Sequence, residues 1–289
     1  MKKLNVNNLD KNKETKLITY LTKSFPKLNI RTVRKALKQK DIKVNGKRIS
    51  EDIMIRNGDE LLIYISDELL YGLPTKIDII YEDSNILVAD KKAGILAENK
   101  IENGEVSLES MLKKQTANEN LALCHRLDRN TSGLIILAKT KEALEEMFKA
   151  FKYSYVNKTY HAYVYGILNK KEDTLNSYLF KDSSKSIVYI HDDFVKGSQK
   201  ITTRYKVLKE FKDYSLLEVK IKTGKTHQIR AHLAYINHPI LGDEKYGYKQ
   251  INDKFKNKFK TQALEAYSYS FNFPKDSFLA YLNNVYIKK

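Results

Sequence analysis

The densest group of reactive side chains in the sequence is His125-Arg126-Leu127-Asp128-Arg129-Asn130-Thr131-Ser132. Apolar residues 121–123 precede it and the apolar stretch 134–138 follows Gly133, so we expect a loop held between two buried strands, as catalytic loops often are. The carboxylate of Asp128 could act as a nucleophile or a base, and the guanidinium groups of Arg126 and Arg129 would stabilise its anionic form. A structural role explains the same residues equally well: an Arg–Asp ion pair could simply stabilise a turn.

A second polar block runs Thr223-Gly224-Lys225-Thr226-His227-Gln228-Ile229-Arg230-Ala231-His232. It is not a nucleotide-binding P-loop, because Val219 stands where that motif requires its first glycine. His227 and His232 lie five residues apart, on different faces of a helix, so we predict structural or RNA-contacting histidines and no metal site. The lone cysteine, Cys124, is predicted to be a buried small residue.

Composition indicates the kind of partner. The 289 residues include 52 Lys and Arg against 35 Asp and Glu, a formal charge of +17, which favours a polyanion such as RNA or an anionic membrane. The sequence has neither the roughly 18 consecutive apolar residues of a membrane span nor an apolar signal peptide, so we expect a cytoplasmic protein that does not bind membranes. With Trp absent, 20 Tyr and 11 Phe would supply any base-stacking surface.

The chain divides by pattern into four segments: a mobile basic tail over residues 1–13, a small domain over 14–66, a polar linker over 67–76, and a large domain over 77–289. In the small domain a helix is predicted from Asn29 as N-cap to Lys40, with Ile30, Val33 and Leu37 on its apolar face. The Asn45-Gly46 pair that follows predicts a hairpin. The basic residues that could contact phosphate here are Arg31, Arg34, Lys35, Lys38 and Lys47.

Strand-length apolar runs dominate the large domain. They cover residues 77–81, 86–89, 134–138, 159–165, 202–208 and 216–221. The clearest helix begins after Thr140 as N-cap and places Leu144, Met147, Phe148 and Phe151 on one face. We therefore predict an α+β protein: a catalytic domain built on a mainly antiparallel mixed sheet with few helices, preceded by a small α/β domain.

Two parts of the chain, each through several short segments, resemble known families. Arg31 to Leu37, Ile42 to Lys47 and Asn57 to Leu61 resemble the small RNA-binding domain named after ribosomal protein S-four. His125 to Gly133 closely resembles the signature of the RluA family of pseudouridine synthases. The block from Thr223 to His232, continued by residues 238–243 and 245–247, and the run Lys158-Thr159-Tyr160 ahead of Gly166 are similar to further motifs of that family, in the same order.

The resemblance implies an enzyme that detaches uracil from its ribose, turns the ring and rejoins it through carbon, with no cofactor. It implies that Asp128 is the catalytic carboxylate, that Tyr160 stacks on the target base, and that Arg230 is the buried partner of Asp128. Arg129 would help to displace the flipped uridine. The plain alternatives are a core tyrosine at 160 and a phosphate-contacting arginine at 230.

The sequence departs from the family pattern at two lysines. Lys225 stands where arginine is usual, which keeps the charge but loses a planar fork. Lys92 stands where proline is frequent, which would loosen its loop.

The predicted substrate is RNA, with large-subunit ribosomal RNA first and transfer RNA as the alternative, and we expect a monomer. Two rival functions use the same features: a non-catalytic RNA-binding or ribosome assembly protein on this scaffold, and a protein drawn to a membrane surface by its charge.

Overall fold

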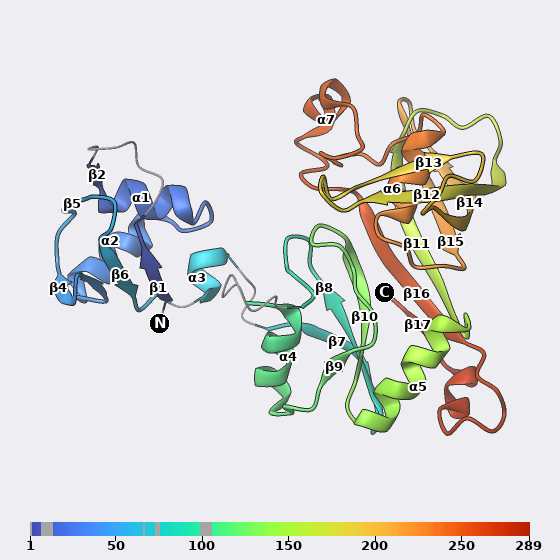
Figure 1. The fold of residues 1–289 in the computed structure, drawn as a ribbon, viewed down its shortest axis with the longest axis horizontal. Coiled ribbons are helices and arrows are strands. Elements are labelled where there is room, and N and C mark those ends of the chain that lie inside the picture. The colour runs from blue at the N-terminus through green and yellow to red at the C-terminus, as the bar shows by residue number, and fades with distance from the viewer. Residues whose placement is uncertain (1, 7–13, 66, 73–75, 99–105) are drawn as a thin grey trace. The chain divides into compact units, whose positions relative to one another are not determined.

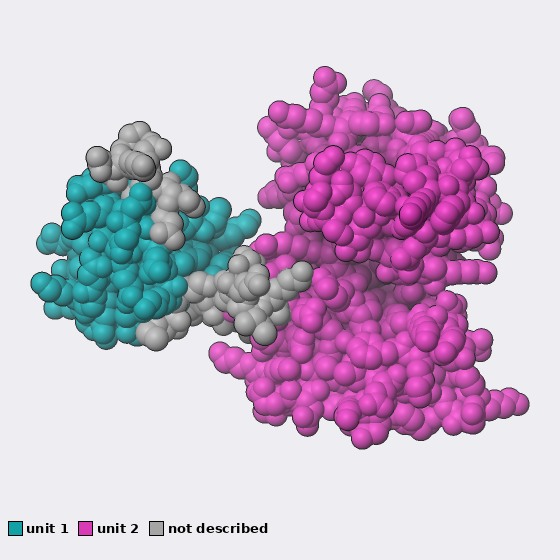
Figure 2. All heavy atoms as spheres, viewed as in Figure 1, with its two compact units in different colours: residues 1–76 teal, residues 77–289 magenta. Residues whose placement is uncertain are grey.

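The computed structural model describes residues 2–6, 14–65, 67–72, 76–98 and 106–289. The chain forms two compact units, Met1–Lys76 and Ile77–Lys289, coloured separately in Figure 2. The second unit begins at Ile77, the predicted first residue of the large domain. Within the described residues, no helix is both long and apolar enough to span a membrane.

The first unit combines a small antiparallel sheet, in the order β1-β6-β3-β4, with short helices. Asn29 caps α2 by accepting a hydrogen bond from the backbone N–H of Arg31, as predicted, and Asn45 and Gly46 take the positive φ angles of the β3–β4 turn. The elements are β1 (Lys2–Asn5), β2 (Thr15–Lys16), α1 (Leu17–Ser24), α2 (Ile30–Lys38), β3 (Ile42–Val44), β4 (Lys47–Ile49), β5 (Met54–Ile55), β6 (Glu60–Ile63) and α3 (Asp67–Tyr71).

Three predictions for this unit are corrected. The predicted mobile tail contains strand β1, which pairs with β6 and leads to the buried Val6; the alternation of Leu4 and Val6 was too short to stand out among lysines and asparagines. Residues 7–13 of that tail lie outside the described residues. The predicted linker contains α3, whose Leu70 is fully buried because it completes the core, while residues 73–75 are not described. Ile30 is 47% exposed; Val33, Ala36 and Leu37 form the buried face of α2.

The second unit is built on one large mixed sheet with the strand order β13-β12-β14-β15-β11-β16-β10-β8-β7 (Figure 1). All its strand pairs are antiparallel except β10 with β16, so the predicted α+β class with a mainly antiparallel sheet is confirmed. Its strands are β7 (Asp78–Glu82), β8 (Ile86–Lys91), β9 (Ala122–Leu123), β10 (Ser132–Ala138), β11 (Val156–Tyr165), β12 (Glu172–Asp182), β13 (Ile187–His191), β14 (Gln199–Glu210), β15 (Tyr214–Ile221), β16 (Leu264–Phe271) and β17 (Tyr286–Lys288).

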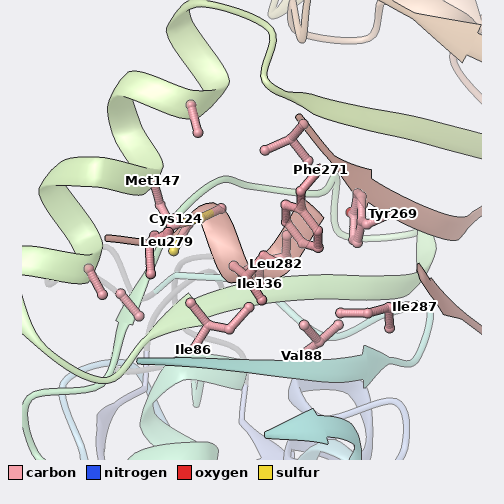
Figure 3. Close-up of a cluster of buried hydrophobic side chains, with 14 of the residues drawn as sticks. Ile86, Val88, Cys124, Ile136, Met147, Tyr269, Phe271, Leu279, Leu282 and Ile287 are labelled. Atoms are coloured by element: carbon pink, nitrogen blue, oxygen red, sulfur yellow. The ribbon is translucent and has the colours of Figure 1, made fainter. Parts of the chain in front are cut away.

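Helices cover this sheet in two regions. Thr140 caps α5 as predicted, and Met147 of that helix packs with Ile136 of β10 and Phe271 of β16 in the core drawn in Figure 3. Phe148, predicted on the same face, is instead 52% exposed. Cys124 is buried in the same cluster, and burial raises the pKa of its thiol. Helix α6 packs against β13 and β14 in the other half. The helices are α4 (Leu108–Thr116), α5 (Lys141–Lys152), α6 (Gln228–Tyr235), α7 (Lys249–Phe255) and a 3-10 helix (Ala280–Asn284).

Candidate active site

The loop that carries Asp128 joins β9 to β10 and is held from several sides. The Asp128 carbonyl accepts the N–H of Thr131, and the Arg129 carbonyl accepts from both the Gly94 N–H at 2.9 Å and the Lys91 ammonium at 2.8 Å. Lys91 is fully buried, and burial lowers its pKa to about 7. At Gly133 an added Cβ would lie 2.2 Å from the Ala266 carbonyl oxygen, so only glycine permits the close pairing with β16 that ends the loop. The loop is therefore rigidly placed.

Asp128 is joined to a cation that comes from far along the chain and that also binds a second carboxylate. Arg230 of α6 donates from Nη1 to Asp128 Oδ2 at 2.8 Å and binds Asp243 through Nε and Nη2 at 2.7 and 2.9 Å. Burial acts to lower the pKa of Arg230, but the hydrogen bonds and charges of Asp243 and Asp128 outweigh it and raise that pKa. The arrangement fixes one carboxylate oxygen of Asp128 while the side chain keeps 28% of its surface exposed.

The start of α6 is shaped by one glutamine. Gln228 accepts from the Thr223 hydroxyl at 2.7 Å and donates to the Thr202 carbonyl and the Thr203 hydroxyl on β14. These bonds tie the turn 223–227 to the sheet. They place Arg230, two residues further on, beneath the Asp128 loop.

Asp128, Tyr160 and Arg230 line one pocket. The remaining lining residues are Arg126, Leu127, Thr131, Ile221, Gly224, Lys225, His227, Gln228, Ile229 and Leu264. Tyr160, on β11, is only 7% exposed, and burial with the nearby charge of Asp128 raises its pKa. The pocket thus combines a carboxylate, an aromatic ring and apolar walls.

The two arginines that neighbour Asp128 in the sequence contact other groups. Arg126 forms a 3.6 Å ion pair with Glu98, and Arg129, which is exposed, donates from Nε to the Gly94 carbonyl at 3.1 Å. Asp128 accepts a hydrogen bond from Arg230 of α6, which lies 102 residues further along the chain.

His227 and Tyr246 form a pair at the edge of the pocket. His227 Nδ1 lies 2.8 Å from the Tyr246 hydroxyl, and His227 Nε2 lies 3.9 Å from Asp128 Oδ2. The Tyr246 ring also lies 5.2 Å from the Arg230 guanidinium. Motif spacing did not assign a role to Asp243 or Tyr246; their place beside Arg230 is visible only in the fold.

Two other histidines of the polar motifs are structural. His125 Nε2 accepts the Ile136 N–H at 3.1 Å, and burial lowers its pKa to about 3. His232 lies between the hydroxyls of Thr203 and Ser177, and burial lowers its pKa to about 4. Neither ring lines the pocket with Asp128.

The two lysine departures have different surroundings. Lys92 pairs with Asp90 at 2.5 Å and with Asp78 at 3.2 Å, so its side chain ties the loop down where a loosened loop was expected. Lys225 lines the pocket and hydrogen-bonds through its backbone N–H to Gln228.

The predicted phosphate contacts of the first unit lie on its surface. Arg31, Arg34, Lys35 and Lys38 are exposed on α2, and Lys47 is exposed at the start of β4. These residues belong to the first unit, and the residues that line the pocket belong to the second.

Comparison with known proteins adds a third line of observation. The family model described as RNA pseudouridylate synthase matches residues 85–235, which include Asp128, Tyr160 and Arg230. The chain is 30% identical to the ribosomal large subunit pseudouridine synthase C of Buchnera aphidicola over 92% of this chain and 88% of that protein. It is 33% identical to the ribosomal large subunit pseudouridine synthase D of Borreliella burgdorferi over 94% and 90%. Among solved structures, human RNA pseudouridylate synthase domain containing 1 has the same fold, with a TM-score of 0.58 and 23% identity over 74% of this chain and 89% of that one.

Proposed function

The chain belongs to the RluA family of RNA pseudouridine synthases, and from this premise we propose that it converts specific uridines of large-subunit ribosomal RNA to pseudouridine with Asp128 as the catalytic carboxylate. The observation that carries the proposal is the placement of Asp128 between a buried arginine and an open pocket. Arg230 donates a hydrogen bond to one carboxylate oxygen of Asp128. Asp128, Arg230 and Tyr160 line the same pocket. We further propose a cytoplasmic enzyme that acts as a monomer.

The position of each residue in the pocket indicates its step in the proposed reaction. The target uridine leaves its stack, at a cost of a few kcal/mol, and its base enters the pocket against Tyr160. Asp128 then acts at the junction of sugar and base, as a nucleophile on the ribose or as a base on a sugar proton. The apolar residues Leu127, Ile221 and Leu264 line the pocket and exclude water from the detached ring.

The ribosomal substrate is supported by the names of the relatives, which act on the large ribosomal subunit. Purified protein is incubated with large-subunit ribosomal RNA and with transfer RNA, both isolated from cells that lack the gene, and new pseudouridines are mapped. We expect new pseudouridine at a few positions of the ribosomal RNA. Modification of the transfer RNA alone would contradict the proposed substrate, and no modification of either RNA by the folded protein would favour a non-catalytic role.

We propose that the first unit is an RNA-binding domain like that of ribosomal protein S-four. Its support is the exposed basic face of α2 and the basic β3–β4 hairpin. Replacing Arg31, Arg34, Lys35 and Lys38 together with glutamine should weaken binding of large-subunit ribosomal RNA and flatten its salt dependence. Each lost phosphate contact lowers the slope of log affinity against log salt by about 0.7 to 0.9.

The measurement is an RNA-binding titration at several salt concentrations, with a melting curve to show that the variant is folded. A chain that starts at Ile77 should lose at least as much of the slope. Identical slopes for the wild type and both altered proteins would remove the first unit from RNA binding.

Tyr160 is proposed to stack on the target base. The buried ring lines the pocket with Asp128, and its hydroxyl has no assigned step, so Tyr160→Phe should keep RNA binding and most turnover. Tyr160→Ala removes the stacking surface, worth about 1 to 3 kcal/mol per base, and should slow turnover by about tenfold to a hundredfold. Single-turnover rates corrected for folded protein decide the matter. If the alanine variant loses activity only in proportion to lost folded protein, Tyr160 is a core residue.

A further inference from the structure

His227 is the one histidine of the pocket lining, and it occupies an unusual backbone position. It immediately precedes α6 with a φ of +53°, which turns its ring toward the Asp128 loop. Its Nε2 lies 3.9 Å from Asp128 Oδ2, which is too far for a hydrogen bond. Within the described part of the chain, Nε2 of His227 has no hydrogen-bond partner. A polar atom of His227 therefore faces the place where the base is proposed to enter.

The partners of Tyr246 favour one tautomer of the neutral His227 ring. The Val188 N–H of β13 donates to the Tyr246 hydroxyl oxygen at 2.9 Å. That hydroxyl has one proton of its own, which it can donate to His227 Nδ1 at 2.8 Å. With Nδ1 accepting, a neutral imidazole holds its proton on Nε2, the nitrogen that faces Asp128 and the pocket.

The surroundings favour the neutral ring. Burial is the main cause that lowers the pKa of His227, and the positive charges of Arg230 and Lys245 lower it further, against the opposing negative charges of Asp128 and Asp243. When the His227 ring is neutral, its Nε2–H brings no positive charge to the carboxylate of Asp128. A charged imidazolium at the same distance would draw Asp128 away from the sugar.

We propose that His227, protonated on Nε2, donates a hydrogen bond to a carbonyl oxygen of the uracil during its isomerisation, and that Tyr246 is the positioning residue that fixes this tautomer. The inference rests on the proposed function and adds a substrate-contacting residue to it. Donors aimed at developing charge are among the largest contributions to catalysis.

The chemistry explains why a donor is needed here. When the bond between the ribose carbon and the ring nitrogen breaks, its electron pair leaves with the ring and spreads onto the carbonyl oxygens, whichever way Asp128 acts. The rejoining step forms a carbon–carbon bond, releases the proton of that ring carbon and returns a proton to the ring nitrogen. His227 stabilises the detached ring and neither gains nor loses a proton overall.

Two substitutions separate this role from a structural one. His227→Asn places an amide near the position of Nδ1, so it can keep the contact with Tyr246 but does not reach the pocket. His227→Gln is longer and can place an amide N–H near the position of Nε2. Asparagine also tolerates a positive φ better than most residues, so a loss of activity in this variant does not follow from backbone strain.

The assay is single-turnover pseudouridine formation on large-subunit ribosomal RNA from cells that lack the gene, with RNA affinity measured in parallel. We expect His227→Asn to slow the reaction about a hundredfold with little change in affinity, and His227→Gln to stay within about tenfold of the wild type. A normal rate for the asparagine variant, or equal losses in both variants, would overturn the inference while leaving the proposed function intact. A wild type that forms no pseudouridine would overturn both.

The tautomer has its own spectroscopic test. In protein labelled with nitrogen-15 in histidine, the chemical shifts of His227 should show a protonated Nε2 and an unprotonated Nδ1. Tyr246→Phe keeps the ring over Arg230 but removes the hydroxyl, so His227 should become a mixture of tautomers and turnover should fall by a few-fold. A wild-type ring protonated on Nδ1 would contradict the assignment.

Discussion

Asp128→Asn is expected to abolish pseudouridine formation, by about 10⁴-fold or more, while fold and RNA affinity stay close to those of the wild type. The amide has nearly the same size as the carboxylate but cannot serve as a nucleophile or base. Its carbonyl can still accept the hydrogen bond from Arg230, and Arg230 keeps both bonds to Asp243. The buried cation therefore stays paired in the variant.

The measurement combines a pseudouridine assay with a melting curve and an RNA-binding titration for both proteins. If Asp128 only stabilised its turn, the asparagine variant would melt at a lower temperature and lose activity only in part. Substantial turnover by a well-folded asparagine variant would refute the catalytic role.

Arg230→Met should have the largest effect on stability of any single change in the site. The substitution leaves the carboxylate of Asp243, which has no exposed side-chain surface, without its cation. Breaking a buried ion pair in this way costs about 3 to 5 kcal/mol, which lowers the melting temperature of the second unit on the order of 10 °C. Activity should also be lost, because Asp128 no longer has the contact that orients it.

A double variant provides the control. Arg230→Met combined with Asp243→Asn removes the stranded charge and should recover part of the lost stability, but it should not recover activity. Thermal or denaturant unfolding of the single and double variants gives the coupling between the two sites. Equal stability of the Arg230→Met variant and the wild type would show that the pair carries little of the folding free energy.

Local patterns predicted much of the fold. The caps at Asn29 and Thr140 and the turn at Asn45-Gly46 depend on neighbouring residues, and all three are present. Strand β1 was missed because its apolar residues are few and lie among charged ones. The helical segment Asp67–Tyr71 was assigned to a linker because it is short and lies next to Gly72 and Pro74, although its Leu70 is buried.

The site shows a similar division. The motif order brought Asp128, Tyr160 and Arg230 together as candidates, and the fold places all three around one pocket. The partners of Arg230 could not be derived from spacing, since Asp243 and Tyr246 reach it only after the chain turns back beyond α6. Lys91 likewise binds the Arg129 carbonyl from a strand 38 residues earlier. These contacts depend on tertiary packing, which short-range sequence periodicity does not predict.

The most direct test of the central claim is to map pseudouridines in the RNA of cells with the gene, without it, and with the gene restored either intact or as Asp128→Asn. The account predicts that specific positions of large-subunit ribosomal RNA lose pseudouridine when the gene is removed. The intact gene should restore those positions, and the asparagine variant, expressed at the same level, should not. An unchanged pseudouridine map after removal of the gene, or full restoration by the asparagine variant, would contradict it.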